Sequence, residues 1–180
     1  MSTPHKQHPF VELARAAIEM YVREHKQIKP PRDLSPEMQT RAGVFVSLHL
    51  PNGELRGCIG TIEPMCDNLA AEIITNAISA ATRDPRFPPV TPAELATLDI
   101  SVDVLTAPEP IDSIHDQDPK QHGLIVQSRK TPWKRGLLLP NLEGIDTAEQ
   151  QYHYTRLYKA NITDPNEPVQ LYRFQVKRYH

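Results

Sequence analysis

The apolar positions of the chain follow a helical period in two long segments. Residues 9–25 carry apolar side chains every three or four positions, after a proline that suits the first turn of a helix. Residues 67–82 show the same spacing, and either Asp67 or Asn68 can cap the start of that segment. The pattern predicts two amphipathic helices, with residues 26–42 as a polar connection after the first.

Two shorter helices are predicted from residue pairs typical of helix starts. Thr91 and Glu94 form a capping box before a short apolar stretch. Asp146 and Glu149 resemble a second such start, and the helix that follows is expected to end near residue 160.

Alternation of apolar and polar residues predicts strands in the rest of the chain. The most regular example directs Ile100, Val102 and Val104 inward, and Asn52-Gly53 is a strong signal for a hairpin. The predicted strands are residues 43–50, 54–62, 99–106, 123–128, 136–139 and 169–177. Because strands and helices neither alternate strictly nor separate fully, we expect an α+β domain with a mainly antiparallel sheet and flanking helices.

Composition narrows the classes of protein. The 180 residues suit one domain, or one domain with a small lobe, and no apolar run approaches the about 20 residues of a membrane span. No apolar segment of the secretory kind follows the N-terminus, so we expect a cytosolic protein. The net charge of −2 does not favour strong non-specific binding of nucleic acid. Basic residues form two clusters: Lys130, Lys134 and Arg135 in one, and Lys177 with Arg178 in the other. We interpret both clusters as solvated surface charge, while local binding of nucleic acid at one of them stays open.

The two cysteines, Cys58 and Cys66, lack the spacing of metal ligands. In a reducing compartment a disulfide between them is not expected, so both are predicted to be free thiols. No phosphate-binding glycine loop and no second zinc-binding histidine accompany them. The sequence therefore predicts no metal site and no cofactor.

The predicted return strand of the hairpin carries the main candidate chemistry. Alternation places Arg56 beside Cys58 on one face, while the aliphatic neighbours point to the core. A guanidinium there is expected to lower the pKa of the thiol below its usual value of about 8.5. Gly57 and Gly60 remove side chains around the thiol, and glycines within strands often mark close approach of a ligand or another backbone. Cys58 is a candidate nucleophile or covalent carrier; the alternative is a small buried residue in a tight hairpin.

Two further positions are candidates for a site. Asp84 and Arg86 flank a proline that holds them in a defined geometry, so the pair could bind a polar or anionic substrate; the alternative is a structural ion pair. His122 precedes a glycine at a strand entrance and is a candidate general base near Cys58, or else a loop residue.

The block Glu54-Leu55-Arg56-Gly57-Cys58-Ile59-Gly60-Thr61 is similar to the signature of the AMMECR domain family, the protein A group of the AmmeMemoRadiSam system. Four further blocks continue the resemblance in order, which covers roughly residues 10–178. They are residues 43–48, 84–90, 100–106 and the pair 122–125 with 136–140. One departure is Asn161, which stands where many relatives carry a glycine, and asparagine can end a helix in the left-handed conformation.

The resemblance implies a single domain over residues 10–178, after a mobile segment 1–9, with a larger and a smaller lobe and a cleft between them. It implies an enzyme of unestablished reaction that acts with Memo-type and radical-SAM proteins in a modification pathway. The alternative is a non-catalytic binding or accessory module for a nucleotide, a nucleic acid or a partner protein. The implied site contains Cys58, His122 and Asp84 in catalytic roles and Arg56, Gly57, Gly60 and Arg86 in substrate binding.

Overall fold

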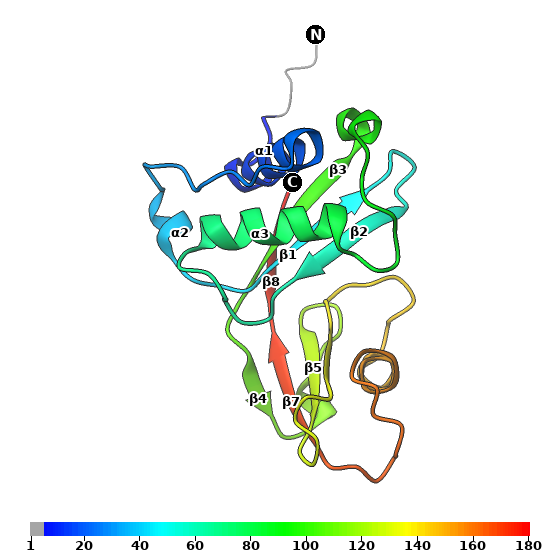
Figure 1. Ribbon diagram of the computed structural model, residues 1–180. Helices are drawn as coiled ribbons and strands as arrows, with labels where there is room; N and C mark the ends of the chain where they lie inside the picture. The colour runs from blue at the N-terminus through cyan, green and yellow to red at the C-terminus, as the bar shows by residue number, and fades with distance from the viewer. Residues whose placement is uncertain (1–5) are drawn as a thin grey trace. The chain divides into compact units, whose positions relative to one another are not determined.

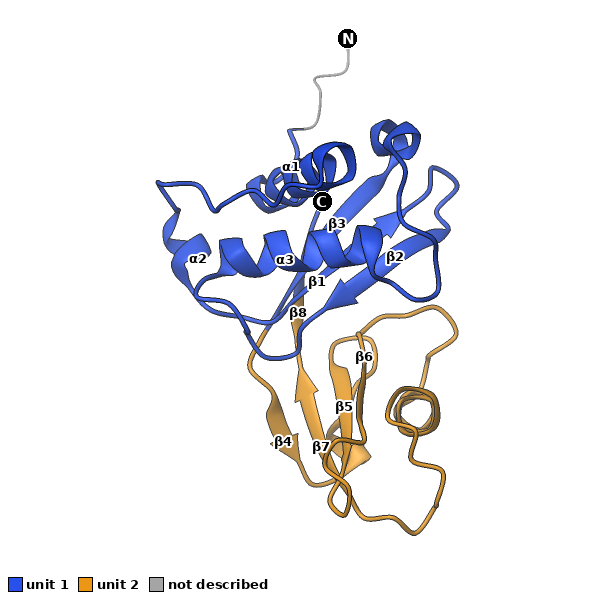
Figure 2. Ribbon diagram, viewed as in Figure 1, with its two compact units in different colours: residues 1–105, 177–180 blue, residues 106–176 orange. Residues whose placement is uncertain are grey.

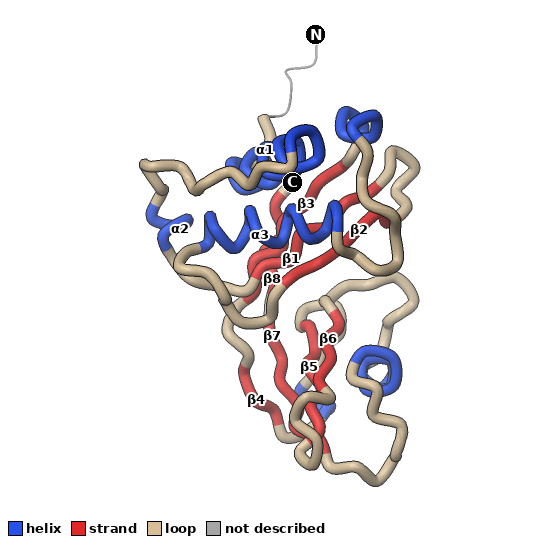
Figure 3. The backbone as a smooth tube through the Cα atoms, viewed as in Figure 1, coloured by secondary structure: helices blue, strands red, loops and turns tan. Residues whose placement is uncertain are grey.

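The computed structural model describes residues 6–180, and the chain divides into two units (Figure 2). Unit 1 comprises residues 1–105, of which 1–5 are not described, together with residues 177–180. Unit 2 comprises residues 106–176. Each unit contains its own four-stranded sheet (Figure 3).

The sheet of unit 1 has the strand order β2-β1-β3-β8 (Figure 1). Its strands are β1 (Val44–His49), β2 (Leu55–Gly60), β3 (Asp99–Leu105) and β8 (Val176–Tyr179). β1 pairs antiparallel with both β2 and β3, and the β1–β2 hairpin turns at the predicted Asn-Gly pair. β2 therefore lies at one edge of the sheet.

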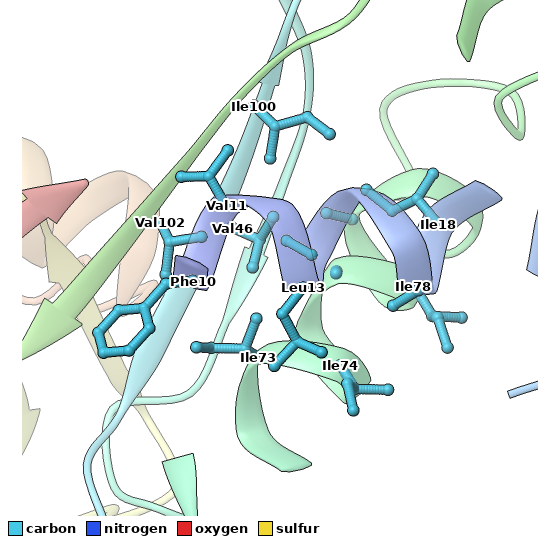
Figure 4. Packing of buried hydrophobic residues seen from close by; sticks show 14 of the residues in the cluster. Phe10, Val11, Leu13, Ile18, Val46, Ile73, Ile74, Ile78, Ile100 and Val102 are labelled. Atoms are coloured by element: carbon cyan, nitrogen blue, oxygen red, sulfur yellow. The ribbon is translucent and has the colours of Figure 1, made fainter. Parts of the chain in front are cut away.

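Two helices cover one face of this sheet, α1 (Pro9–Glu24) and α3 (Leu69–Thr82). α1 contacts β3, α3 contacts β1 and β2, and the helices contact each other. Their apolar stripes meet the inward residues of the strands in one core (Figure 4). The core includes Phe10, Val11, Leu13, Ile18, Val46, Ile73, Ile74, Ile78, Ile100 and Val102.

The sheet of unit 2 has the order β4-β7-β5-β6 and a smaller core. Its strands are β4 (Glu109–Ile111), β5 (Gly123–Ser128), β6 (Arg135–Leu138) and β7 (Val169–Phe174). All three of its pairings are antiparallel. α4 (Ala148–Tyr154) continues into a π-helical turn, η3 (Thr155–Lys159). This turn packs against β6, and because Gly136 has no side chain, the backbone of the turn can approach the strand there.

Most predicted elements are confirmed, and the α+β architecture with antiparallel sheets is confirmed with them. Two short helices were not predicted: α2 (Pro36–Gln39), which lies within the predicted polar connection, and η2 (Ile114–Asp116). A third, η1 (Pro92–Thr97), starts at the expected capping box but is a 3₁₀ helix. β4 was not predicted either, because three residues are too short for an alternating pattern.

Two boundary predictions were wrong for identifiable reasons. The helix start near residue 146 is capped by Thr147 with Gln150 rather than by Asp146 with Glu149, because a hydroxyl and an amide satisfy the same free backbone groups. The final strand 169–177 is two strands, β7 and β8, which belong to different sheets.

The predicted mobile segment 1–9 falls partly on residues 1–5, which lie outside the described residues. At its other end, the His8 backbone N–H donates to the carbonyl of His180 at 3.0 Å, and the His8 ring packs on Phe10 and Tyr179. Within residues 6–180, none of the helices has the length and apolar character needed to cross a bilayer.

Candidate functional site

The face of the unit 1 sheet opposite the helices carries polar side chains. Alternation along β1 and β3 directs Val46 and Val102 into the core and therefore turns Ser47 and Asp103 the other way. Across the sheet, Ser47 lies opposite Cys58 on β2 and opposite Ser101 on β3. We call this surface the thiol face; it comprises Ser47, Cys58, Ser101 and Asp103, together with the side chains that pair at its border, Asp84, Arg86 and Arg178.

The thiol of Cys58 is partly exposed and accepts a hydrogen bond from the Ser47 hydroxyl, with Oγ and Sγ 3.3 Å apart. Burial raises the pKa of Cys58 above its usual value. The Ser47 hydrogen bond and the charge of Arg86 lower that pKa, but burial outweighs them. The expectation that Arg56 lowers the pKa of Cys58 is therefore wrong: the pKa is raised, and the guanidinium that favours the thiolate is Arg86.

Asp84 ties the edge strand to the loop after α3. Its Oδ2 accepts the backbone N–H of Cys58 at 3.0 Å and Nη2 of Arg86 at 2.8 Å, while its Oδ1 accepts the backbone N–H and Nε of Arg86. The hydrogen bond from the Arg86 side chain, followed by those of the two backbone N–H groups, lowers the pKa of Asp84 to about 2. The predicted pairing of Asp84 with Arg86 is confirmed, and Asp84 also satisfies an N–H of an edge strand.

A second buried carboxylate lies on the same face. Asp103 accepts Nε and Nη2 of Arg178 from the neighbouring strand β8 at 2.7 and 2.8 Å. These hydrogen bonds raise the pKa of Arg178. This pair was not predicted, and the interpretation of Arg178 as solvated charge is wrong. The acidic residue within an alternating strand was the signal that a charged partner was needed.

Arg56 lies on β2 but pairs away from the thiol. Its Nε and Nη2 donate to the two carboxylate oxygens of Glu94 at 2.8 and 3.2 Å. Glu94 is also the acceptor of the capping box at Thr91, and the Arg56 hydrogen bond is the main reason that its pKa falls to about 2. Arg56 therefore connects the edge strand to η1, and its assignment to substrate binding stays a prediction.

The two glycines beside the thiol have close neighbours of their own. A Cβ on Gly57 would lie 2.3 Å from the carbonyl oxygen of Ala80 in α3. A Cβ on Gly60 would lie 2.3 Å from the ring of Phe45 and 2.4 Å from the carbonyl oxygen of Val44. Helix packing and ring packing account for both glycines without a ligand, and their role in substrate binding stays a prediction.

Comparison with known proteins places these residues in a family. The family model described as AMMECR1 matches residues 11–179 of the chain. The chain belongs to the AMMECR1 family. The resemblance inferred from the sequence blocks is thereby confirmed.

Relatives in the AMMECR1 family include short and long proteins. A protein of Thermotoga maritima is 50% identical over 174 residues, which are 96% of this chain and 98% of the relative. A protein of Clostridium acetobutylicum is 46% identical over 173 residues, 95% of this chain but 36% of the relative. The crystal structure of an uncharacterized protein from Pyrococcus horikoshii is 36% identical, with a TM-score of 0.83 over 94% of this chain and 88% of that one.

In this AMMECR1-family chain, His122 belongs to unit 2. Its backbone carbonyl accepts hydrogen bonds from the side-chain amides of Gln117 and Gln151, both at 3.0 Å. Its Nδ1 is buried and has no hydrogen-bond partner among the described residues. A general-base role for His122 toward Cys58 stays a prediction. Among residues 6–180, no three His, Cys, Asp or Glu side chains gather closely enough to hold a metal ion.

Proposed function

We propose that the thiol face binds a small polar ligand with an anionic group, and that the chain works as a binding or accessory module. The ion pair between Asp84 and Arg86 carries this proposal. The Asp84 side chain is 2% exposed and the Arg86 side chain is 50% exposed, so a buried carboxylate orients a guanidinium that reaches solvent. A planar guanidinium in a defined orientation suits recognition of carboxylate and phosphate groups.

The second ion pair of the face repeats this arrangement. The Asp103 side chain is 1% exposed, whereas that of Arg178 is 40% exposed. Both guanidinium groups interact electrostatically with Cys58. Asp84 and Asp103 oppose a negative charge at the thiol, but their side chains are buried, so an incoming anionic group would meet the exposed guanidinium groups first.

The state of the thiol favours binding over attack. The thiolate is the nucleophilic form of cysteine, and burial raises the pKa of Cys58. At neutral pH the resting side chain is a neutral thiol that offers a weak donor and a polarisable contact. Asp84 is poorly suited to remove the thiol proton, because a carboxylate with a pKa of about 2 is a weak base.

Titration calorimetry with inorganic phosphate and with succinate tests this proposal on the full chain. We expect Arg86→Gln to weaken binding of the better probe by about tenfold or more, and Cys58→Ser to leave it within about twofold. Lys26→Ala is the control, since Lys26 is an exposed cation that pairs with Glu24 elsewhere in unit 1. Unchanged binding in Arg86→Gln, or equal losses in Arg86→Gln and Cys58→Ser, would overturn the proposal.

A second candidate function is an enzyme in which Cys58 becomes the nucleophile. The partial exposure of the thiol and the influence of Arg86 on its pKa favour it. In such a step Sγ bonds an electrophilic carbon of the substrate, a base takes the thiol proton, and the electron pair of the bond broken at that carbon moves onto a carbonyl oxygen or leaves with a leaving group. The discriminating observation is a covalent adduct on Cys58 in the purified protein, or alkylation by iodoacetamide faster than that of free cysteine at neutral pH.

We also propose that the chain acts in the cytosol beside Memo-type and radical-SAM proteins. The resemblance of the sequence blocks to the protein A group of the AmmeMemoRadiSam system is what supports this partnership. Sedimentation of the purified chain mixed with each purified partner is the test. A complex of defined stoichiometry supports the partnership, and free components at micromolar concentrations argue against it.

A further inference from the structure

The hairpin loop between β5 and β6 in unit 2 concentrates positive charge around an exposed aromatic ring. We call residues 129–135, Arg-Lys-Thr-Pro-Trp-Lys-Arg, the basic loop; it contains four cationic residues and no acidic one. Trp133 is the only tryptophan of the chain, and it is 82% exposed. An indole ring left in water is unfavourable unless another surface covers it part of the time.

The basic loop is held in one conformation by its own hydrogen bonds. The Thr131 backbone N–H donates to Ser128 Oγ at 2.8 Å, and the Lys134 backbone N–H donates to the Thr131 carbonyl at 2.8 Å. The side-chain amide of Gln127 donates to the carbonyl of Pro132 at 3.0 Å, directly before the tryptophan. The ring therefore stands on an ordered scaffold, which lowers the entropic cost of binding.

A polar cavity of about 350 Å³ opens beside the loop. Lys130, Thr131 and Lys134 line it from the loop, and Thr163 and Asn166 line it from the segment before β7. Neither lysine ammonium group has a hydrogen-bond or ion-pair partner among the described residues. The size and the lysines suit a phosphate group with its attached sugar.

Two carboxylates, Glu167 and Asp164, also line the cavity, and one oxygen of each accepts hydrogen bonds from the protein. Glu167 Oε1 accepts the hydroxyls of Ser128 at 3.0 Å and Thr131 at 3.3 Å. Asp164 Oδ1 accepts the backbone N–H of Asn166 at 2.9 Å. The cavity therefore holds two cations and two anions, and a bound phosphate would have to contact the lysine ammonium groups directly.

We propose that the basic loop binds a nucleotide unit, with the base stacked on Trp133 and the phosphate between Lys130 and Lys134. Stacking of a base on an aromatic side chain beside cations is the usual mode of single-strand recognition. The net charge of −2 keeps any such binding weak and local. The unit can come from a free nucleotide or from a single-stranded RNA, and both sources share this chemistry.

The intrinsic fluorescence of the single tryptophan reports this contact directly. Titrations of the full chain with adenosine monophosphate and with a short oligouridylate are expected to quench it. Quenching by the oligonucleotide alone indicates strand binding, and quenching by both at similar nucleotide concentration indicates a free nucleotide; either result supports the proposal. The absence of quenching by both probes at millimolar concentration overturns it.

Variants separate stacking from charge, with fluorescence anisotropy of a labelled oligouridylate as the readout. Trp133→Ala is expected to weaken binding at least about fivefold, while Trp133→Phe keeps most of it. The double variant Lys130→Ala, Lys134→Ala should reduce the salt dependence of binding, and Lys26→Ala should change nothing. Binding that is equal in Trp133→Ala and wild type shows general attraction of a polyanion and overturns the proposal.

Discussion

The backbone N–H of Cys58 donates to the buried carboxylate of Asp84, and this hydrogen bond joins the edge strand β2 to the loop after α3. An N–H at the outer side of an edge strand has no partner in the sheet. Asp84 supplies that partner and holds Arg86 with the same carboxylate. One side chain thus stabilises the strand and orients the cation of the candidate site.

Asp84 should make the free energy of unfolding depend on pH in the acid range. Its pKa falls from an ordinary 3.8 to about 2, so its ionised form stabilises the folded state. That contribution is complete above about pH 4 and is lost as pH falls through about 2, which amounts to about 2 kcal/mol at neutral pH. Urea unfolding measured from about pH 7 down to about pH 2 should show Asp84→Asn less stable than the wild type at neutral pH and less sensitive to acid.

Glu94 provides the internal comparison for this measurement. Its pKa also falls to about 2, from 4.5, so the single variant should keep part of the acid dependence. The double variant Asp84→Asn, Glu94→Gln should have the flattest profile. Parallel profiles of wild type and Asp84→Asn would show that Asp84 is not the titrating group.

The Ser47 hydroxyl should control the pKa of the Cys58 thiol. Because its hydrogen bond to Sγ favours the thiolate, Ser47→Ala should raise that pKa further and slow alkylation by iodoacetamide at a given pH. Rates against pH, measured by mass spectrometry in a Cys66→Ser background, give the shift. A pKa that stays the same or falls in Ser47→Ala contradicts the expected role of the hydroxyl.

Arg56 and Glu94 should be coupled in stability. The Arg56 side chain is buried, so Arg56→Ala leaves the Glu94 carboxylate without its main partner and is expected to cost about 2–4 kcal/mol. Arg56→Ala combined with Glu94→Gln should cost less than the sum of the two single changes. Denaturant unfolding of the four proteins gives the coupling energy, and additive losses would mean that the pair does not act as a unit.

Gly57 should tolerate no side chain, because α3 approaches β2 at that point. Gly57→Ala places a methyl group 2.3 Å from a backbone oxygen, which forces the helix from the sheet, and we expect a loss of more than about 2 kcal/mol. Gly53→Ala is the matched control. A methyl group at Gly53 meets no close neighbour, so we expect a loss of stability of only about 1 kcal/mol, the cost of placing a side chain on a residue with a positive φ. Equal thermal shifts in the two variants would refute the packing argument.

Local patterns anticipated the features that depend on nearby residues. The period of apolar residues gave α1 and α3, and the Asn-Gly turn gave the β1–β2 hairpin, because both signals act over a few positions. Asn161 has a φ of 55°, the left-handed conformation predicted for an asparagine that ends a helix. The sequence blocks were also sufficient to place the chain in its family.

The charge partners of the candidate site depended on contacts between distant segments. Alternation predicted Arg56 and Cys58 on one face, but the register of β1 and β2 shifts between Leu48 and His49. Arg56 pairs with Glu94, 38 residues away, and Arg178 reaches Asp103 across 75 residues. An arginine side chain is long enough to reach several carboxylates, and the spacing of residues along one strand does not predict which of them it pairs with. Burial also raised the pKa of Cys58, and burial is a property of the assembled unit.

The sequence by itself determined α1, α3, the β1–β2 hairpin and the α+β class, because these follow from periodicity and local turn chemistry. Only the tertiary structure decided which ion pairs form, which residues surround Cys58, and that burial raises the pKa of its thiol. Electrostatic free energies vary with distance and with the exclusion of water, and folding sets both quantities by bringing remote segments together.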